Sequence, residues 1–363
     1  MSLSSRLAAH VRLGERGYPI LVGQGLSRQL GEVIAELIPD ASGCVVVTSP
    51  TIDELHSEAV MAGLEWLSPV KLMVPDGEEA KTWATAETVI SGLIDCGLKR
   101  SGVVVALGGG AVGDLAGFAA SIYLRGVRLV QVPTTLLGMV DSSIGGKTAL
   151  NHPGGKNLVG SFHQPSAVVI DPALLETLPV REIRSGLAEA VKYGVISDAG
   201  LFNYIEEYAE RLQSLDQGAL THVIKVSASI KAGYVEKDER DDKGIRAALN
   251  LGHTMGHAVE RLTSPQVRHG EAVSVGMVYA SRLSAEKNVM TRTDCARLKR
   301  VLDRLRLPTE IPELPEDELI TLIRRDKKAT GDGIRFVLPT GIGREPLCTA
   351  VEEELIRGSL KAR

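Results

Sequence analysis

The chain has 363 residues, more than a single hydrophobic core usually holds, so its length predicts two domains. A net charge of −4 disfavours a general nucleic-acid or membrane-surface binder, and an aromatic content of 4% disfavours base-stacking surfaces. Any anionic substrate must therefore be held by a local cluster of lysine and arginine side chains.

The N-terminal residues and the cysteines predict the cellular compartment. Arg6, Arg12 and Arg16 stand where a secretory signal would need an apolar stretch. No segment of the sequence approaches the ~18 consecutive apolar residues of a membrane span. The four cysteines are scattered without a Cys-x-x-Cys pair, as is typical of reduced thiols. We therefore expect a cytoplasmic protein.

The first half of the chain alternates extended and helical patterns. Apolar, β-branched runs occur at residues 44–48, 70–74, 103–107, 129–132 and 167–170. Between them, segments such as residues 84–96 repeat apolar side chains at helical spacing. Strands that are nearly continuously apolar and separated by helices predict a parallel sheet that is covered on both faces.

From about Leu178 the pattern becomes helical. The spacing of apolar residues predicts helices at residues 184–196, 201–215, 220–235, 249–262, 271–287, 293–305 and 316–325. Only residues 335–338 look extended in this half. The change near Pro179 predicts a Rossmann-like α/β dinucleotide-binding domain with a parallel sheet over residues 1–179. An all-α domain follows over residues 180–363.

Two segments of the first half have the composition of a dinucleotide site. Residues 108–114, Gly-Gly-Gly-Ala-Val-Gly-Asp, follow a predicted strand and precede a helix expected to open at Leu115. Glycines let the backbone approach a pyrophosphate, which the N–H groups of a helix N-terminus stabilise. Residues 76–81 follow another strand, and their carboxylates can accept ribose hydroxyls and repel a 2′-phosphate, which favours NAD over NADP. The alternatives are a ligand-free glycine turn and a solvated charged turn.

A second polar run, residues 141–157, is rich in glycine, lysine, serine and threonine. Glycine amides together with lysine ammonium groups are what a phosphate or phosphonate site needs. Residues 145–148, Gly-Gly-Lys-Thr, are similar to part of a nucleoside-triphosphate loop, but the first glycine of that motif and its spacing are absent. The run therefore predicts a phosphate site that is not a triphosphate site.

Three distant residues, Glu189, His253 and His269, offer one carboxylate and two imidazoles, the ligand set of a catalytic divalent metal with an open position. His253 and His257 are four residues apart, so they share a helical face. His257 is either a fourth metal ligand or an acid/base group. Alternatively, His253 and His257 both have a purely structural role. Arg246 and Asn250 would lie near the same surface, unless they belong to an exposed helix face.

These motifs, in this order, resemble the 3-dehydroquinate synthase family. The most specific are residues 141–149 with 154–157, residues 186–194 (Gly-Leu-Ala-Glu-Ala-Val-Lys-Tyr-Gly) and residues 249–260 (Leu-Asn-Leu-Gly-His-Thr-Met-Gly-His-Ala-Val-Glu). The resemblance covers nearly the whole chain. It implies an N-terminal dinucleotide domain, a C-terminal helical domain, and a cytoplasmic enzyme of the shikimate pathway to aromatic amino acids.

The activity implied is that of a carbon–oxygen lyase acting on phosphate. The substrate, 3-deoxy-D-arabino-heptulosonate 7-phosphate, would be oxidised transiently by NAD, lose phosphate by β-elimination, be reduced again and close by an intramolecular aldol step. The product would be 3-dehydroquinate. A divalent metal, Zn²⁺ or Co²⁺, would polarise the hydroxyl that is oxidised.

The resemblance also assigns roles to residues. The metal ligands would be Glu189, His253 and His269. NAD would be surrounded by Asp76, Gly77, Glu78, Glu79, Ala80, Lys81, Gly110, Ala111, Val112, Gly113, Asp114, Thr134, Thr135, Lys147, Lys156, Leu174, Leu175, Glu176 and Thr177. The substrate would contact Asp141, Lys147, Lys156, Asn157, Lys192, Lys231, Arg246, Asn250, His257 and Lys327, with Lys328 as the alternative to Lys327. In a homodimer, Arg125 would reach the substrate phosphate across the interface.

One departure from the family pattern concerns residues 241–243, where the chain is one residue longer than expected. The spacing between Lys231 and Arg246 therefore differs from that of the family, and the substrate role of Lys231 follows less directly from the resemblance. Three other functions stay open at this stage. Related sugar-phosphate cyclases act on other heptulose or hexose phosphates, metal-dependent polyol dehydrogenases share a similar glycine loop, and a non-catalytic sugar-phosphate sensor could use the same fold. Residues 141–147 and 152–156 favour 3-dehydroquinate synthase over the other cyclases. The density of lysines disfavours a polyol dehydrogenase, and the occupied ligand and lysine positions disfavour a sensor.

Overall fold

The structure is a computed structural model that describes residues 3–326 and 333–361. Its contacts divide the chain into two compact units. The first comprises the chain up to Pro179 together with Leu220–Arg240, and the second comprises Val180–Ala219 and the chain from Asp241.

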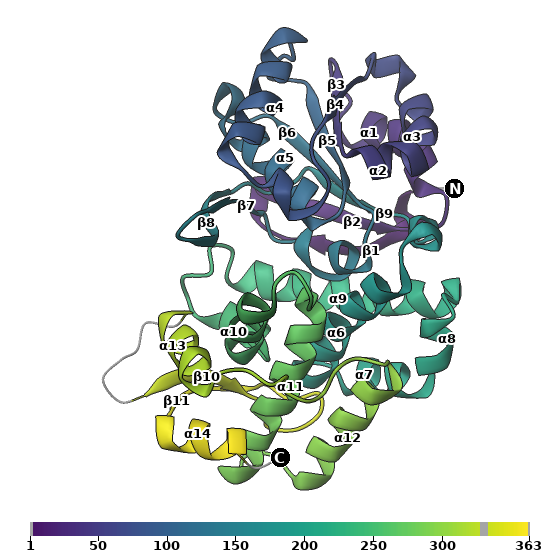
Figure 1. Cartoon of the computed structure of the whole chain (residues 1–363). Helices are drawn as coiled ribbons and strands as arrows, with labels where there is room; N and C mark the ends of the chain where they lie inside the picture. The colour runs from purple at the N-terminus through teal and green to yellow at the C-terminus, as the bar shows by residue number, and fades with distance from the viewer. Residues whose placement is uncertain (1–2, 327–332, 362–363) are drawn as a thin grey trace. The chain divides into compact units, whose positions relative to one another are not determined.

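The first unit is built on a seven-stranded sheet (Figure 1). Its strands, in spatial order, are β1 (Leu7–Val11), β2 (Tyr18–Val22), β9 (Ala167–Ile170), β6 (Arg128–Pro133), β5 (Val103–Gly108), β3 (Cys44–Thr48) and β4 (Val70–Met73). All neighbours pair in parallel except β1 and β2, which form an antiparallel edge. The five predicted strands are confirmed, whereas β1 and β2 were not predicted.

Helices cover both faces of this sheet (Figure 1). α4 (Trp83–Asp95) and α5 (Gly110–Ile122) lie on one face, where Val45, Val104 and Leu93 share a buried core. α1 (Leu30–Leu37) and α3 (Glu58–Gly63) lie on the other, and a short helix, α2 (Pro50–Ile52), follows β3. β3 and β5 are buried along their whole length, as expected for parallel strands between two helical layers.

A hairpin occupies the polar run that follows β6. β7 (Lys147–His152) and β8 (Gly155–Phe162) pair in antiparallel fashion. It is anchored on α5, because Ser161 Oγ donates to Ser121 Oγ at 2.7 Å and a Cβ at Gly117 would lie 2.6 Å from Thr148 Cγ2. No strand was predicted in this polar run, so β7 and β8 are additions to the predicted elements.

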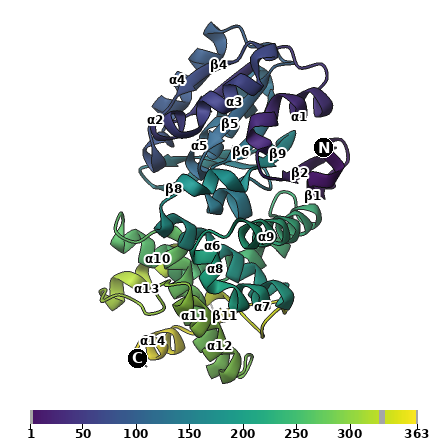
Figure 2. The ribbon, with the colours of Figure 1, turned by 90° about the vertical axis from the view of Figure 1, so that its right-hand side faces the viewer.

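Helix α9 (Gln217–Lys237) packs mostly with the first unit, although it follows the second unit's helices in sequence (Figure 2). Ser229 Oγ donates to the carbonyl oxygen of Ala8 at 3.1 Å, and the Arg12 amide donates to Glu236 Oε1 at 2.9 Å. The domain boundaries predicted from sequence, 1–179 and 180–363, differ from this division only in the placement of residues 220–240. Apolar spacing predicts a helix but does not say which core the helix covers.

The second unit is mainly helical. Its helices are α6 (Val180–Ile196), α7 (Ala199–Glu207), α8 (Ala209–Gln213), α10 (His253–Thr263), α11 (His269–Glu286), α12 (Arg292–Arg304), α13 (Glu316–Asp326) and α14 (Glu353–Lys361). A hairpin of β10 (Ile334–Leu338) and β11 (Leu347–Val351) completes it. Its strand β10 matches the predicted extended segment, and β11 is an addition to the all-α expectation. The predicted fold class is confirmed.

Four helices of the second unit, α6, α10, α12 and α14, pack on the long helix α11. Tyr279 lies in a buried core with Met255, Ile323 and Phe336, and its hydroxyl donates to the carbonyl oxygen of Ile356 at 2.6 Å. None of the helices in the described part of the chain is long and apolar enough to span a membrane.

We predict that Leu93→Ala lowers the free energy of unfolding of the first unit by ~2–5 kcal/mol, because it opens a cavity in the buried face of α4. Ile94→Ala, one residue along the same helix, is the matched control, since Ile94 is 60% exposed. Its effect should stay within ~0.5 kcal/mol. Urea unfolding followed by circular dichroism measures both, and equal losses in the two variants would contradict this packing.

Candidate active site

The predicted dinucleotide residues follow the carboxyl ends of parallel strands. The glycine loop comes after β5, Asp76 follows β4, and Thr134 follows β6. Leu174 and Thr177 lie in a 3-10 helix, Pro172–Thr177, after β9. The carboxyl ends of parallel strands meet at one edge of a sheet, where open α/β folds bind ligands. The fold therefore gathers four distant segments at the edge where a dinucleotide would bind.

The glycine loop is closely packed. A Cβ at Gly110 would lie 2.9 Å from Ser142 Oγ, and one at Gly113 would lie 2.8 Å from Gln131 Oε1. α5 begins at Gly110, so the unpaired N–H groups of its first turn belong to the loop itself. The prediction that this helix opens at Leu115 is wrong.

A small hollow beside this loop is lined by Gly108, Gly109, Gly110, Gly113, Gln131, Pro133, Gly138, Ser142 and Ser143. Several of these residues were not selected from the sequence. Ser142 and Ser143 belong to the polar run at residues 141–157, whose composition was the available indication. Gln131 and Gly138 lie in apolar stretches of the sequence, which gave no indication of a binding role.

Lys81 connects three segments of the predicted dinucleotide and substrate sites. Its Nζ donates to Asp114 Oδ2 at 2.7 Å and to the side-chain oxygen of Asn157, and the Lys81 side chain is 3% exposed. Glu78 Oε2 lies 3.9 Å from the same ammonium. Burial raises the pKa of Asp114, although the neighbouring Lys81 ammonium opposes the shift. Lys81 thus ties α5 to β8 and to the acidic segment after β4.

Two hydrogen bonds hold the outer part of this edge. Thr51 Oγ1 donates to Asp76 Oδ2 at 2.8 Å, and hydrogen bonds from Ser49 and Thr51 lower the pKa of Asp76. Thr177 Oγ1 lies 2.9 Å from His56 Nε2. The lowered pKa keeps Asp76 as a carboxylate, the form that accepts hydrogen bonds from hydroxyl groups. Neither Thr51 nor His56 was identified from the sequence, because each makes its hydrogen bond to a residue distant in the chain.

Asp141 and Lys231, both predicted substrate residues, are in direct contact. Lys231 Nζ donates to Asp141 Oδ1 at 2.6 Å and to its carbonyl oxygen at 2.7 Å. The Lys231 side chain is 7% exposed, so the pair is largely removed from solvent. The contact places Lys231, whose spacing to Arg246 departs from the family pattern, beside another predicted substrate residue. Lys147, Lys156 and Arg125 are exposed in the chain.

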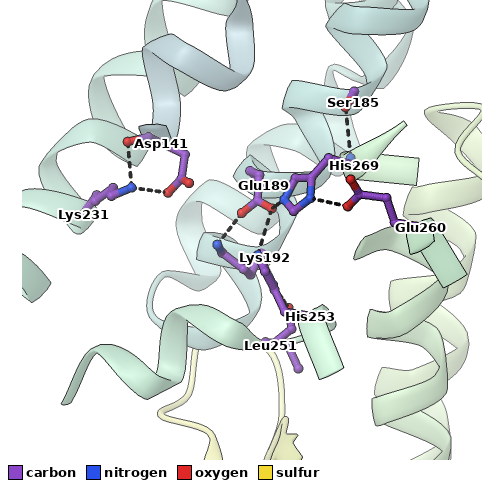
Figure 3. A network of polar contacts seen from close by, with 10 residues as sticks. Asp141, Ser185, Glu189, Lys192, Lys231, Leu251, His253, Glu260 and His269 are labelled. Carbon is purple, nitrogen blue, oxygen red and sulfur yellow. Dashed lines mark hydrogen bonds and ion pairs between the residues drawn. The ribbon is translucent and has the colours of Figure 1, made fainter. Parts of the chain in front are cut away.

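Three elements of the second unit bring Glu189, His253 and His269 together. Glu189 lies in the middle of α6, while His253 and His269 are the first residues of α10 and α11. One ligand atom from each lies within 4.8 Å of the others, as a single metal ion requires. Figure 3 shows both rings beside the Glu189 carboxylate. Glu189 Oε1 is 3.7 Å from His253 Nε2 and 3.4 Å from His269 Nε2.

The charges of this cluster are strongly coupled. Glu189 is fully buried and pairs with the Lys192 ammonium one turn further along α6. Burial lowers the pKa of His253 to about 3, so this imidazole is neutral and can act as a ligand. Burial acts in the same direction on His269, but hydrogen bonds to Glu189 and Glu260 outweigh it and raise its pKa to about 10.

Close backbone contacts hold these three elements in register. A Cβ at Gly270 would lie 2.0 Å from the carbonyl oxygen of Ser185, so α11 can approach α6 only with glycine there. The Gly270 amide donates to Ser185 Oγ at 3.0 Å. A Cβ at Gly276 would lie 1.8 Å from the carbonyl oxygen of Gly252, which precedes His253. These two glycines of α11 therefore position all three candidate ligands.

The other predicted residues of the second unit lie around α10. The His253 and His257 rings are 5.2 Å apart between centroids, which confirms their shared helical face. Arg246 is buried in a 3-10 helix, Ile245–Asn250, that ends at Asn250. The single helix predicted over residues 249–262 is therefore wrong at its start, because Gly252 adopts φ +82° and breaks it before His253. Lys327 and Lys328 lie outside the described residues.

Comparison with known families gives consistent matches in both halves of the chain. Residues 71–185 match the family described as 3-dehydroquinate synthase N-terminal, and residues 186–329 match 3-dehydroquinate synthase C-terminal. A 3-dehydroquinate synthase of Geobacter metallireducens is 48% identical over 92% of this chain and 93% of its own length.

Solved structures give the same fold. A crystal structure of 2-deoxy-scyllo-inosose synthase complexed with carbaglucose-6-phosphate, NAD+ and Co2+ is 27% identical, with a TM-score of 0.88 over 98% of this chain and 99% of that one. The 2-epi-5-epi-valiolone synthase of Streptomyces hygroscopicus subsp. jinggangensis, with NAD+ and Zn2+ bound, is 29% identical, with a TM-score of 0.86 over 95% and 96%.

We predict that Gly270→Ala weakens Zn²⁺ binding at least tenfold and lowers the melting temperature by several degrees, because the added methyl group pushes α11 away from α6. Gly358→Ala in α14 is the control, since a Cβ there meets no atom within 4 Å. That variant should keep its Zn²⁺ affinity and be as stable as the parent or more so. Calorimetric titration and thermal unfolding measure both, and unchanged Zn²⁺ binding in Gly270→Ala would contradict the role of this contact.

Proposed function

The chain belongs to the 3-dehydroquinate synthase family, and we propose that its first unit binds NAD while Glu189, His253 and His269 of its second unit hold a divalent metal. The reaction of the family converts 3-deoxy-D-arabino-heptulosonate 7-phosphate to 3-dehydroquinate and phosphate in the shikimate pathway. The observation that carries the proposal is the cluster of one carboxylate and two imidazoles within 4.8 Å of one another.

The donor set fits Zn²⁺ or Co²⁺. Two imidazoles and one carboxylate are a usual set for catalytic zinc, which leaves a position open for substrate. The 2-deoxy-scyllo-inosose synthase structure contains Co2+ and the valiolone synthase structure contains Zn2+, which supports either ion. The Glu189 carboxylate is fully buried, so a cation beside it offsets the cost of burying its charge.

The glycine loop and its surroundings fit a dinucleotide. A Cβ at Gly110 or Gly113 would come within 3.0 Å of the Ser142 or Gln131 side chain, and the first turn of α5 offers N–H groups to a pyrophosphate. The carboxylate of Asp76 stands after β4, where it can accept ribose hydroxyls. Both related cyclase structures contain NAD+, which supports NAD as the cofactor.

Bound NAD would supply a reversible oxidation of a substrate hydroxyl, and the bound metal would act as a Lewis acid on that oxygen. The chain's own residues bind and orient the substrate. We assign its carboxylate and phosphate to cationic side chains, among them Lys147, Lys156, Lys192 and Arg246. Phosphate leaves with cleavage of a carbon–oxygen bond, so we class the enzyme as a lyase.

The contact between Lys231 and Asp141 gives the substrate site a preformed element. Lys231 donates to the side chain and to the carbonyl oxygen of Asp141, which fixes the start of the polar run at residues 141–157. The amide of Gly145 donates to the hydroxyl of buried Tyr18 at 2.9 Å, which holds the same run from the other side. The run is thus fixed at Asp141 and at Gly145, so a substrate would meet a backbone that is already ordered.

Two related activities are distinguished by substrate. The curated 3-dehydroquinate synthases are 42–48% identical to this chain, whereas the 2-deoxy-scyllo-inosose and valiolone synthase structures are 27–29% identical. The higher identities favour the heptulosonate phosphate over other sugar phosphates. The cytoplasmic location inferred from sequence stays a prediction.

An apolar surface supports the proposed homodimer. Ile122 at the end of α5 and Leu124 in the following 3-10 helix are 42% and 43% exposed. On the adjoining strand β8, Leu158, Val159 and Phe162 are 66%, 37% and 46% exposed. Large apolar side chains gathered on neighbouring elements mark protein–protein interfaces. Arg125 stands directly after Leu124, so a partner chain bound here would meet it.

We predict that the purified protein releases phosphate from 3-deoxy-D-arabino-heptulosonate 7-phosphate without net NADH formation. Glu189→Gln should lower kcat at least a hundredfold and lose metal, because the neutral amide is a poor ligand in place of the carboxylate. Glu310→Gln is the control, since its carboxylate is exposed and pairs with Arg282. Phosphate release that survives both Glu189→Gln and a chelator would rule out the metal centre, and a faster reaction with glucose 6-phosphate would rule out the substrate.

We predict that Arg125 acts on the partner subunit's site. Arg125→Ala and Glu189→Gln chains should each be nearly inactive alone. Mixed dimers should regain activity, because one of their two sites combines an intact Glu189 with an intact Arg125 from the other chain. Random reassociation of equal amounts should approach about a quarter of the parent's activity by this counting. No recovery after verified exchange of subunits would mean that Arg125 acts within its own chain.

A further inference from the structure

We propose that Glu260 is a positioning residue for the metal centre, which fixes the orientation and tautomer of His269 and strengthens its binding to the metal. Glu260 lies on α10, seven residues after His253, and so on the face of the helix that carries the histidines. The inference rests on the metal centre proposed above and assigns Glu260 no contact with the ion.

The two candidate imidazoles are held by different acceptors. His253 Nδ1 donates to the carbonyl oxygen of Leu251 at 3.1 Å, and His269 Nδ1 donates to Glu260 Oε2 at 3.1 Å. A carbonyl and an ionised carboxylate only accept, so each bond requires the proton on Nδ1. Each Nε2 faces Glu189, 3.7 Å away for His253 and 3.4 Å away for His269, so a bound metal would meet both of these nitrogens there. Figure 3 shows the His269 ring between the two carboxylates.

The acceptors differ in charge and in attachment. Leu251 is two residues before His253, so that bond is local and its acceptor is neutral. Glu260 brings a negative charge from another helix, and its side chain is 16% exposed, so water screens the pair only in part. A carboxylate on the outer nitrogen makes the inner nitrogen of an imidazole more basic and limits rotation of the ring.

The position of His269 explains the need for such a partner. It is the first residue of α11, and its side chain is 30% exposed, whereas that of His253 is 12% exposed. A less enclosed ring has more freedom to turn, so it gains more from a fixed acceptor. The capping residue Glu271 orients the backbone of the same turn, because it accepts from the Arg268 amide at 2.9 Å and pairs with Arg181. Glu271 holds the helix end, and Glu260 holds the ring.

The test is metal affinity, measured on the purified full chain after metal has been removed by dialysis. Zn²⁺ is titrated against a chromophoric chelator in the parent, Glu260→Ala, Glu260→Gln and the control Glu310→Gln. We expect the dissociation constant to rise about 10–100-fold in Glu260→Ala. Glu260→Gln should lie between it and the parent, because the amide oxygen accepts the same bond without the charge. The Glu310→Gln variant should match the parent.

The spectrum of bound Co²⁺ gives a second readout that a structural role would not move. Its visible bands should change in Glu260→Ala while the melting temperature of the metal-free protein stays near that of the parent. If Glu260→Ala fails to fold, the near-isosteric Glu260→Gln decides the question by affinity. Dissociation constants within twofold of the parent in every folded Glu260 variant overturn the inference.

A double substitution separates this inference from the metal centre itself. If Glu260 acts through His269, removing it from a His269→Ala chain should cause no further loss of affinity. Full Zn²⁺ affinity in His269→Ala alone would mean that the metal centre is wrong. Loss of affinity in His269→Ala together with unchanged Glu260 variants would leave the metal centre standing and refute only the role of Glu260.

Discussion

A carboxylate buried in the middle of a helix is the constraint on which the second unit depends. Glu189 is fully buried on α6, whose residues from Ser185 to Ile196 are buried as well. An isolated carboxylate in such a place would cost far more than a protein's net stability, so it requires positive charge or donors around it. Lys192 and His269 meet this need in the chain itself.

The need to surround Glu189 also determines how the neighbouring helices begin. His253 and His269 are each the first residue of a helix, and a glycine lies next to each of them. Gly252 ends the preceding 3-10 segment before α10, and Gly270 allows α11 to contact Ser185. Removing one partner of a buried charge typically costs ~3–5 kcal/mol, so the cluster stabilises the packing as well as forming a site. Stability and metal binding are therefore coupled through the same contacts.

Most of the fold could be predicted from the sequence because buried parallel strands and amphipathic helices leave a clear pattern. The strands β3 to β6 and β9 are mostly apolar, and α6, α11 and α12 begin and end close to their predicted bounds. The edge strands β1 and β8 were missed, since β1 is partly exposed and β8 exposes its apolar residues. The spacing of apolar residues also could not show which unit contains α9, because that depends on long-range contacts.

The candidate site shows the same division between local and distant information. The histidine pair on α10 is a local pattern, so its shared helical face followed from spacing. The glycine loop was predicted between a strand and a helix, but the helix begins at Gly110 and not at Leu115. The link from Glu260 to His269 and the role of Thr51 depend on segments that meet only after folding. A glutamate on a polar helix face has the same appearance in sequence whether it meets solvent or an imidazole.

Backbone strain supports the functional interpretation of Arg125. Leu124 and Arg125 both have positive φ, at 49° and 63°, and Gly126 follows at 116°. Positive φ in a non-glycine residue costs on the order of 1–3 kcal/mol, and such strain concentrates at functional sites. The turn is held by hydrogen bonds from Arg100 to the Leu124 carbonyl oxygen, at 2.7 Å, and from the Gly126 amide to the Tyr123 carbonyl oxygen, at 2.9 Å. The turn presents an exposed arginine beside exposed Ile122 and Leu124, as an arginine that reaches into a partner's site would require.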